Sequence, residues 1–228
     1  MNLGIIIPAR LSSKRLPKKV LLRYKGKTIL EYVIDIAKKI NHKKKIIVSI
    51  SCSKKDDKLE NFLKRKKIKF YRGDLNNVSK RFLDTINFYS FDTVIRLNGD
   101  SPLHNPSILN YGLRLFKKKK AKFVTNIFKR TFPKGMSVEI INANFYRTVY
   151  SKIKSKQDKS NITSIIYRKK KNYKVLSFMN DKNFSNINLC VDNFDDFKFF
   201  KFFIKKYGRI NITKSYKSYL NILEKINF

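Results

Sequence analysis

The first 126 residues alternate between two patterns of apolar positions. Short runs rich in β-branched residues read as buried strands, and between them apolar residues recur at spacings of three and four, which indicates helices. The strands are expected at residues 3–7, 46–50, 68–71, 93–97 and 123–125. The helices are expected at residues 28–37, with Thr28 as the N-cap, and at 56–66, 78–89 and 108–116. This alternation predicts βαβ units and a parallel sheet.

Beyond residue 126 the pattern becomes less regular. Strand-like runs occur at residues 138–141, 173–178 and 187–191, with helical stretches between them. No internal repeat and no linker rich in Pro, Gly or Ser divides the chain. We therefore expect a single α/β domain over residues 1–228, with an elaborated second half.

The segment 194–204 has two interpretations. Viewed as a helix, it places Phe197, Phe200, Phe203, Ile204 and Tyr207 on one stripe, with lysines on the opposite face. A helix lying on a membrane surface has a similar pattern. A helix that packs its Phe stripe onto the core is the favoured prediction.

The charge of the chain is strongly positive. There are 53 Lys and Arg against 16 Asp and Glu, a formal net charge of +37. Such an excess is typical of nucleic-acid-binding proteins, but Lys far outnumbers Arg and is spread along the whole chain. Abundant Lys, Asn, Ile, Phe and Tyr also arise from A/T-rich codons. The charge alone does not identify a partner, and we expect no specific nucleic acid.

Cysteine content and hydrophobicity narrow the class of protein further. The chain has two Cys, too few for a disulfide scaffold. No apolar run approaches the roughly 20 residues that span a bilayer, and the first residues lack the pattern of a secretory signal. These features predict a cytoplasmic protein without membrane insertion.

Polar residues that can bind a metal–triphosphate follow three of the predicted strands. The loop after the first strand carries Arg10, Arg15 and Lys19, which suit phosphate oxygens; the alternative is a basic loop in a basic protein. Asp100 follows the fourth strand and Asp192 the last one. Ligands of open parallel sheets bind at this edge, and Mg²⁺ commonly takes one or two carboxylates plus substrate phosphates. Either Asp could instead cap the next helix.

Several motifs resemble those of a known family. Residues 6–19 and 26–27 (IIPARLSSKRLPKK and GK) are similar to the opening of bacterial sugar cytidylyltransferases, which include the CMP-Kdo and CMP-sialic acid synthetases. The motifs at 72–74 with Arg81, 96–103, 132–139 and 191–196 resemble the cytidylyltransferases of spore-coat polysaccharide biosynthesis. The similarity runs from about residue 3 to 205.

The resemblance implies a fold and an activity. The fold is a three-layer nucleotide-binding α/β structure with a mostly parallel sheet, of the nucleotide-diphospho-sugar transferase type. The activity is Mg²⁺-dependent transfer of CMP from CTP to a sugar or keto-sugar acid, with release of pyrophosphate, for surface polysaccharide synthesis. Residues 1–126 would form the nucleotide-binding half, and residues 127–228 the acceptor and dimerisation half of a possible homodimer.

The resemblance also assigns roles to individual positions. Arg15 and Lys19 would be catalytic, and Asp100 and Asp192 would ligate the metal. The nucleotide would be bound by Ala9, Arg10, Ser13, Arg15, Lys19, Arg72, Asp74 and Asn98. The sugar would be bound by Thr125, Asn126 and Glu139. All of these residue identities are present in the chain.

Departures from the family pattern concentrate in the acceptor half. Lys134 and Ser137 replace two Asp of the spore-coat-type motif, and Asn161 replaces a His. The alternatives are a glycosyltransferase of similar architecture, although the Asp-x-Asp metal motif of that class is absent, and a basic nucleic-acid-binding protein. His42 and His104 have no metal-ligand partner at suitable spacing, and both are interpreted as surface or local hydrogen-bonding residues.

Overall fold

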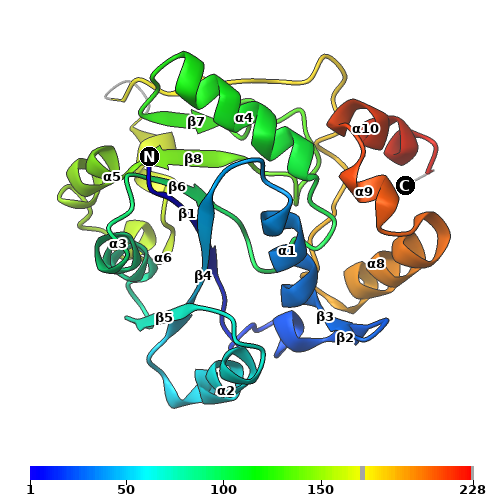
Figure 1. Ribbon diagram of the computed structural model, residues 1–228, viewed down its shortest axis with the longest axis horizontal. Coiled ribbons are helices and arrows are strands. Elements are labelled where there is room, and N and C mark those ends of the chain that lie inside the picture. Colours follow the sequence, from blue (N-terminus) through cyan, green and yellow to red (C-terminus); the bar gives the residue numbers. More distant parts are fainter. Residues whose placement is uncertain (170–172, 227–228) are drawn as a thin grey trace.

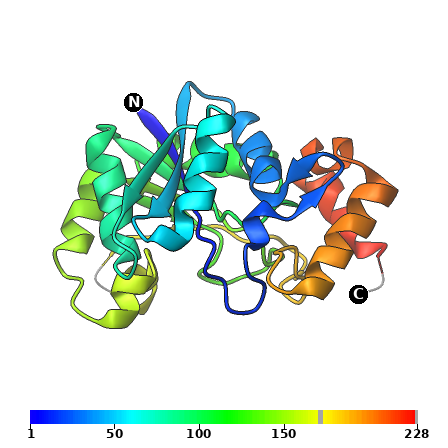
Figure 2. The ribbon, with the colours of Figure 1, turned by 90° about the horizontal axis from the view of Figure 1, so that it is seen from below.

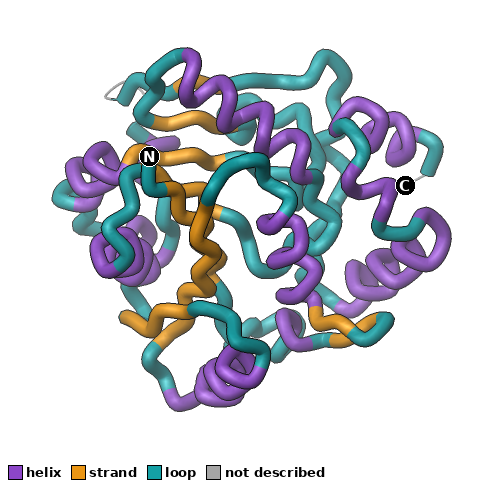
Figure 3. The backbone as a smooth tube through the Cα atoms, in the orientation of Figure 1, coloured by secondary structure: helices purple, strands orange, loops and turns teal. Residues whose placement is uncertain are grey.

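The computed structural model describes residues 1–169 and 173–226. A seven-stranded sheet runs through the middle of the molecule with helices around it (Figures 1 and 3). Its strands, in sheet order, are β5 (Phe70–Gly73), β4 (Lys44–Ser51), β1 (Leu3–Pro8), β6 (Thr93–Arg96), β8 (Glu139–Asn142), β7 (Phe123–Thr125) and β9 (Leu176–Ser177). A separate hairpin joins β2 (Arg23–Tyr24) and β3 (Lys27–Thr28).

Strand β8 is the antiparallel element of the large sheet. It lies antiparallel to both β6 and β7, whereas the other neighbouring strands pair in parallel. The α/β class and the mostly parallel sheet expected from the sequence are confirmed. The same sheet takes strands from both halves of the chain, because β6 pairs with β8 across the change in pattern at residue 126.

Helices cover both faces of the sheet, which makes three layers. One face carries α1 (Ile29–Lys38), α2 (Asp57–Arg65), α4 (Pro106–Lys118), α8 (Phe194–Tyr207) and α10 (Tyr216–Glu224). The other face carries α3 (Val78–Phe88), α5 (Ala143–Tyr150) and α7 (Ser164–Arg168). Two short helices, α6 (Lys156–Ser160) and α9 (Ile210–Thr213), complete the set in the described residues.

The alternation of side chains along β1 explains the two cores. Leu3, Ile5 and Ile7 contact the apolar cluster on the α1 face, and Ile6 contacts the cluster on the α3 face. All four side chains are buried. Successive residues of a strand point to opposite faces of the sheet, so a strand between two helical layers must be apolar throughout. The continuous apolar runs of the sequence reflect this burial on both sides.

Helix starts follow the expected capping chemistry. Thr28 caps α1 in a capping box with Glu31, and Asn193 caps α8 in a second box with Asp196. Helix α8 buries Phe197, Phe200 and the rest of its predicted inner stripe except Tyr207, which is half-buried. The prediction of a core helix at this position is therefore confirmed.

Two predicted strands differ in the structure. The run 173–178 forms only the two-residue β9. The run 187–191 forms no strand and contributes a single bridge, between Asn188 and Lys134. Its alternating residues Ile187, Leu189 and Val191 are buried. The pattern thus reflects burial of one side of an extended segment, and the predicted strand is wrong because this segment pairs with no strand among the described residues.

Candidate active site

A cavity of about 710 Å³ lies at the carboxyl ends of β1 and β6. These strands pair in parallel, so the loops that follow them leave the same edge of the sheet. Gly99 allows their close approach, because a Cβ there would lie 3.1 Å from the backbone oxygen of Pro8. The lining comes from Pro8, Ala9, Arg10, Ser12, Ser13, Lys14, Arg15, Lys19, Val20, Leu75, Asn76, Val78, Arg81, Arg96, Asn98, Gly99, Asp100, Ser160 and Asp192.

Lys19 joins two carboxylates at one side of this cavity. Its Nζ lies 2.6 Å from Oδ2 of Asp100 and 2.7 Å from Oδ1 of Asp192. The guanidinium of Arg15 adds a contact of 3.0 Å to Oδ2 of Asp192. Lys19 is only 12% exposed in its side chain, whereas Arg15 is 68% exposed. The structure thus brings together four residues that lie up to 177 positions apart in the chain.

Backbone contacts hold the two carboxylates in place. The amide of Val191 donates to the backbone oxygen of Asp100 at 2.8 Å, which ties the two loops together. The amide of Asp192 donates to Oδ2 of Asp196 at 2.8 Å, so the capping box of α8 also fixes the site. Asp192 therefore follows an extended segment held by loops, and the strand end expected at this position is replaced by these contacts.

The ion pairs change the acidity of their members. Burial alone would lower the pKa of Lys19, but the charges and hydrogen bonds of Asp100 and Asp192 outweigh it and raise that pKa. Burial would raise the pKa of Asp192, and Lys19 and Arg15 together hold it below its usual value. The pairing consequently stabilises the fold across the neutral range, and is lost when Asp192 is protonated at low pH or Lys19 is deprotonated at high pH.

The donor set fits a hard divalent cation. Because Asp100 and Asp192 each place an oxygen within 2.7 Å of one cationic nitrogen, their carboxylates converge on a common point. Within residues 1–169 and 173–226, no group of three or more His, Cys, Asp or Glu side chains is arranged to hold a metal. An ion such as Mg²⁺ at this point would thus take its remaining ligands from water and substrate phosphates.

A buried carboxylate anchors the basic loop. Asp56 is 1% exposed, and its Oδ1 accepts the amide of Leu11 at 2.7 Å while its Oδ2 accepts the hydroxyl of Ser51. The sequence places Asp56 at the start of a helix, where an acidic residue reads as a cap. In the structure the Asp56 side chain makes no capping hydrogen bond to the start of α2. Its role as an anchor depends on a contact over 45 residues, which periodicity does not reveal.

Two arginines in the cavity have unpaired donors. The Nε atoms of Arg81 and Arg96 are buried and make no hydrogen bond within the protein. Arg81 is 2% exposed and donates from Nη1 to the backbone oxygen of Asp74 at 2.7 Å. Arg96 pairs with the buried Glu139. Buried donors without partners are rare and costly, so both arginines are candidates to bind a polar group of a ligand.

Other predicted nucleotide-binding residues fall into two groups. Ala9, Arg10, Ser13 and Asn98 line the cavity, beside the Lys19 centre. Arg72 and Asp74 lie outside its lining, and their expected place near the nucleotide stays a prediction. The guanidinium of Arg72 is held by Asp57 and Glu60 of α2 and by two backbone oxygens.

The short segment after β5 explains the position of Asp74. Its Oδ1 accepts the amides of Asn76 and Asn77, both at 2.8 Å, and so shapes the entry into α3. Leu75 and Asn76, the next residues, reach the cavity. The motif is thus next to the site, but its charged side chains stabilise the loop.

The three expected sugar-binding residues lie outside the cavity lining, and their role in sugar binding stays a prediction. Thr125, Asn126 and Glu139 are at most 1% exposed and do not line the cavity. Glu139 accepts the hydroxyls of Thr163 and Tyr167 at 2.7 and 2.8 Å, and Asn126 bonds to the backbone of Met136 and Val138. Thr125 and Glu139 share the hydroxyl of Tyr167 in a buried network, and the antiparallel pairing of β8 with β6 brings Glu139 to Arg96, with which it forms an ion pair.

Neither histidine lines the cavity. His104 is buried, with its ring nitrogens near the backbone oxygens of Ser137 and Asn105 at 2.9 and 3.1 Å. His42 lies in the turn before β4. The interpretation of His104 as a local hydrogen-bonding residue agrees with these contacts.

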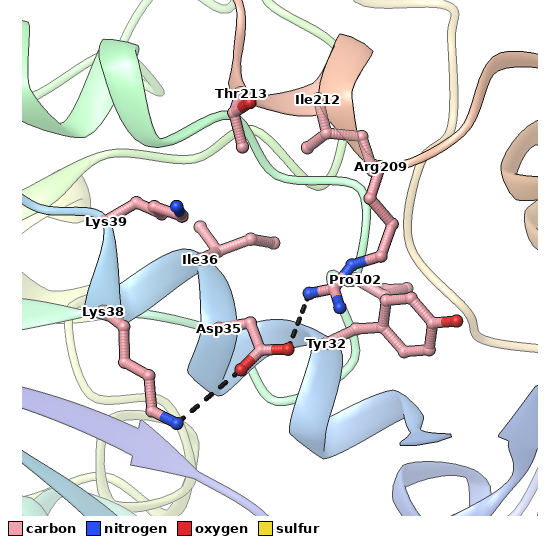
Figure 4. A pocket seen from close by; sticks show the side chains of 9 residues that line it. All are labelled: Tyr32, Asp35, Ile36, Lys38, Lys39, Pro102, Arg209, Ile212 and Thr213. Carbon is pink, nitrogen blue, oxygen red and sulfur yellow. Dashed lines mark hydrogen bonds and ion pairs between the residues drawn. The ribbon is translucent and has the colours of Figure 1, made fainter. Parts of the chain in front are cut away.

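A second cavity, of about 540 Å³, lies between α1 and α9 (Figure 4). Arg209 reaches across it to Oδ2 of Asp35 at 2.6 Å, and its guanidinium lies 4.9 Å from the ring centre of Tyr32. Lys27 donates to the same carboxylate at 2.7 Å. Burial would raise the pKa of Asp35, but these two cations hold it below its usual value. The contacts tie the C-terminal helices to α1.

Replacing Asp35 with Asn is expected to destabilise the protein in a pH-dependent way. Charged hydrogen bonds of this kind contribute on the order of 1–3 kcal/mol each, and we expect a loss in that range at pH 7. Because the folded pKa of Asp35 is lowered, its contribution is present above the unfolded pKa and disappears as the pH falls through the folded value. Urea unfolding at pH 7 and at about pH 2.5, below the ordinary Asp pKa of about 3.9, measures this, and equal destabilisation by the substitution at the two pH values would contradict it.

The fold and the site together define a class of protein. The fold has three layers, and the edge of the sheet where the parallel strands end carries a cationic loop and two convergent carboxylates. This is the architecture of a nucleotide-binding transferase. Comparison with known proteins identifies the family within this class. The sequence profile of the family described as cytidylyltransferase matches residues 4–226. The chain belongs to the cytidylyltransferase family and is a CTP-using nucleotidyltransferase.

Individual relatives agree with this assignment. A cytidylyltransferase structure from Leptospira borgpetersenii superimposes with a TM-score of 0.91 at 28% identity, covering 99% of this chain and 94% of that one. The spore coat polysaccharide biosynthesis protein SpsF of Bacillus subtilis is 25% identical over 89% of this chain and 86% of its own length. A CMP:2-keto-3-deoxy-manno-octonic acid synthetase complexed with CTP has the same fold, with a TM-score of 0.66 at 14% identity over 90% of this chain and 99% of that one.

Replacing Arg81 with Lys is expected to raise the KM for CTP about 10- to 100-fold, with a smaller effect on kcat. The change keeps the charge but removes the planar donor group with its unpaired Nε, and a charged hydrogen bond accounts for this range. Steady-state kinetics at varied CTP measures it. Arg114→Lys, on the exposed side of α4, is the control. An unchanged KM would show that Arg81 does not contact the nucleotide.

Proposed function

We propose that this enzyme transfers CMP from CTP to a hydroxyl group of a sugar acid and releases pyrophosphate, with Mg²⁺ as the cofactor. The observation that carries the proposal is the convergence of Lys19, Asp100 and Asp192 in a cavity that also receives the cationic loop. A triphosphate needs fixed positive charge along its length, and a metal-bridged one needs a pair of carboxylates at one end.

The residues of the cavity divide into separate tasks. Arg10, Arg15 and Lys19 would bind the phosphates, because they are the cations that the loop after β1 brings to the cavity. Asp100 and Asp192 would hold Mg²⁺, which would offset the charge that develops on the transferring phosphoryl group. Ala9, Ser13, Asn98 and Arg81 would position the nucleoside side of CTP.

The bond changes follow from the substrates. An acceptor hydroxyl oxygen forms a bond to the α-phosphorus, the bond from that phosphorus to the bridging oxygen breaks, and pyrophosphate leaves with that oxygen. The hydroxyl proton would pass to solvent, because neither histidine lines the cavity and both of its carboxylates are assigned to the metal. Catalysis in this arrangement depends on positioning and charge neutralisation.

The acceptor is proposed to be a carboxylated sugar. Arg96 lines the cavity and has a buried Nε without a partner, whereas Arg81, the other lining arginine with such an atom, is assigned to the nucleotide. Arg is well suited to a carboxylate, which it can bind with two parallel hydrogen bonds. Ser160 from the second half of the chain lines the same cavity. A role in surface polysaccharide synthesis is supported by the similarity to SpsF.

A coupled assay tests the proposed reaction. The protein is incubated with CTP and MgCl₂ and with eight- and nine-carbon keto-sugar acids in turn, and pyrophosphate release is followed together with the mass of the nucleotide product. We expect equal amounts of pyrophosphate and CMP-sugar with one of these acids. Pyrophosphate release without a CMP-sugar, or equal activity with neutral sugars, would contradict the proposed acceptor class.

A further inference from the structure

The outer face of α8 exposes aromatic side chains beside lysines. Phe194 is 56% exposed and Phe202 is 47% exposed, although the inner stripe of the same helix is buried. At 100° per residue, both rings fall on the solvent arc of the helix. The arc also holds Lys198, Lys205 and Lys206, which are exposed, and Lys201 at its border. The helix lies at the periphery of the molecule in both ribbon views (Figures 1 and 2).

Lysine side chains cover the two rings in this structure. The Nζ of Lys198 lies 5.1 Å from the ring centre of Phe194, and the Nζ of Lys206 lies 5.5 Å from that of Phe202. Both are cation–π pairs at spacing i, i+4, and they are solvent-exposed, so each is weak. The long aliphatic stems of the lysines allow their ammonium groups to leave the rings and bind an anion, while the rings stay in place.

The charge on this arc is one-sided. Four lysines face a single acidic residue on the solvent arc, Asp195, which is already paired with Lys198 at 3.0 Å. A second copy of this chain would bring the same lysine-rich face, and a further net charge of +37, against it. The surface therefore favours an anionic partner that also accepts apolar rings.

We propose that α8 docks the protein onto an anionic phospholipid surface. The helix would lie flat, with Phe194 and Phe202 at the level of the headgroups and the four lysines on lipid phosphates. Interfacial helices combine aromatic rings with Lys in this way, and juxtamembrane lysines are attracted by anionic lipids. No helix among the described residues is long and apolar enough to cross a bilayer, so the contact is peripheral. A single nucleic-acid strand offers charge and stacking bases but no apolar layer for two rings on one flat face.

The docking would bring the catalytic cavity near the membrane. Helix α8 begins two residues after Asp192, and Asp196 in its first turn holds the amide of Asp192. The cavity therefore adjoins the N-terminal end of the proposed surface. An enzyme placed in this way would release its product close to the lipid headgroups.

A single tryptophan makes the contact measurable. The chain contains no Trp, so Phe202→Trp introduces a unique fluorophore into the proposed surface, and Phe88→Trp places one at an exposed Phe on α3 as a control. Both variants of the full chain are titrated with vesicles of phosphatidylcholine containing 30% phosphatidylglycerol, and with pure phosphatidylcholine vesicles, at 150 mM salt. We expect a blue shift only for the α8 reporter and only with the anionic vesicles.

Charge and ring variants separate this surface from general attraction. In the Phe202→Trp background, changing Lys198, Lys201, Lys205 and Lys206 to Gln is expected to weaken vesicle binding at least about 50-fold. The same change at Lys117–Lys120, which are exposed, removes equal charge and is expected to weaken it less than about 5-fold. With a dye-labelled protein followed by cosedimentation, Phe194→Ser with Phe202→Ser should weaken binding, whereas Phe88→Ser with Met179→Ser should not.

Four results would overturn the proposal. Equal losses in the two quadruple variants would show uniform attraction of a basic protein to an anionic surface. A larger response of the reporter to a single-stranded oligonucleotide than to vesicles would identify a nucleic-acid surface. A blue shift that depends on protein concentration in the absence of vesicles would identify contact between copies. Absence of any shift with anionic vesicles would also refute it.

Discussion

The Asp100→Asn variant is expected to retain its fold and to lose about 100- to 1,000-fold in kcat/KM for CTP. The carboxamide has nearly the same shape as the carboxylate but carries no charge, so the cavity keeps its form. One of the two oxygen donors that converge on the point now occupied by Lys19 Nζ would be lost. Pyrophosphate release at varied CTP and MgCl₂ measures the loss, and the variant should require more Mg²⁺ for half-maximal rate.

The control for this variant is Asp195→Asn. Asp195 has an exposed side chain in the first turn of α8 and makes one ion pair, to Lys198, at the surface. It undergoes the same change of charge and lies near Asp192 in sequence but not in the cavity lining. We expect its turnover to stay within about 2-fold of the parent enzyme, because surface ion pairs contribute little. Unchanged turnover in Asp100→Asn itself would refute the metal assignment.

The Lys19→Met variant is expected to lose about 100- to 1,000-fold in kcat/KM for CTP while binding a divalent ion more tightly. The ammonium group of Lys19 is paired with both carboxylates, so a divalent cation must displace it in order to bind them. Removing that group frees Asp100 and Asp192 for the ion, and at the same time takes a positive charge away from the phosphates. Mn²⁺ binding without nucleotide, followed by calorimetry, separates the two effects.

Lys18→Met serves as the matched control, since Lys18 is exposed and does not line the cavity. It should leave both the kinetics and the Mn²⁺ affinity nearly unchanged. Weaker Mn²⁺ binding in Lys19→Met than in the parent would contradict the competition between Lys19 and the ion. The opposite metal responses of the Asp100 and Lys19 variants also distinguish two losses of activity that look alike in a single assay.

Sequence periodicity predicted the layers and the edge of the sheet where the site lies. Strands β1 and β6 are buried on both faces, so their apolar runs are unambiguous, and residues that follow parallel strands must share one edge. Arg10, Lys19 and Asp100 line the cavity, as their positions after these strands predict. These positions do not show that Lys19 lies between the two carboxylates, because that contact depends on how the loops fold back.

The second half of the chain was harder to interpret because its strands are short and mixed in direction. Glu139 begins β8, and the antiparallel pairing of β8 with β6 brings its side chain to Arg96, in a buried network with Thr163 and Tyr167. Arg72 also lies outside the cavity lining, for a different reason. Its motif is next to the site, but its side chain forms ion pairs with Asp57 and Glu60 of α2.

The net charge also has two components. The cations of the cavity, such as Arg10 and Lys19, are placed by the fold and face the substrate site. Most of the other lysines lie on exposed helix and loop positions, where they increase the general attraction of anions without selecting one. The arc of α8 differs because its lysines accompany exposed rings.

Calorimetric binding of CTP with and without Mg²⁺ tests the central claim most directly, because it requires no knowledge of the acceptor. In the parent enzyme Mg²⁺ should tighten CTP binding at least about 10-fold, whereas in a variant with both Asp100→Asn and Asp192→Asn it should have no effect. CTP binding that is equally tight with and without the metal in the parent enzyme, or equally metal-dependent in the double variant, would contradict a metal–triphosphate site built on these two carboxylates.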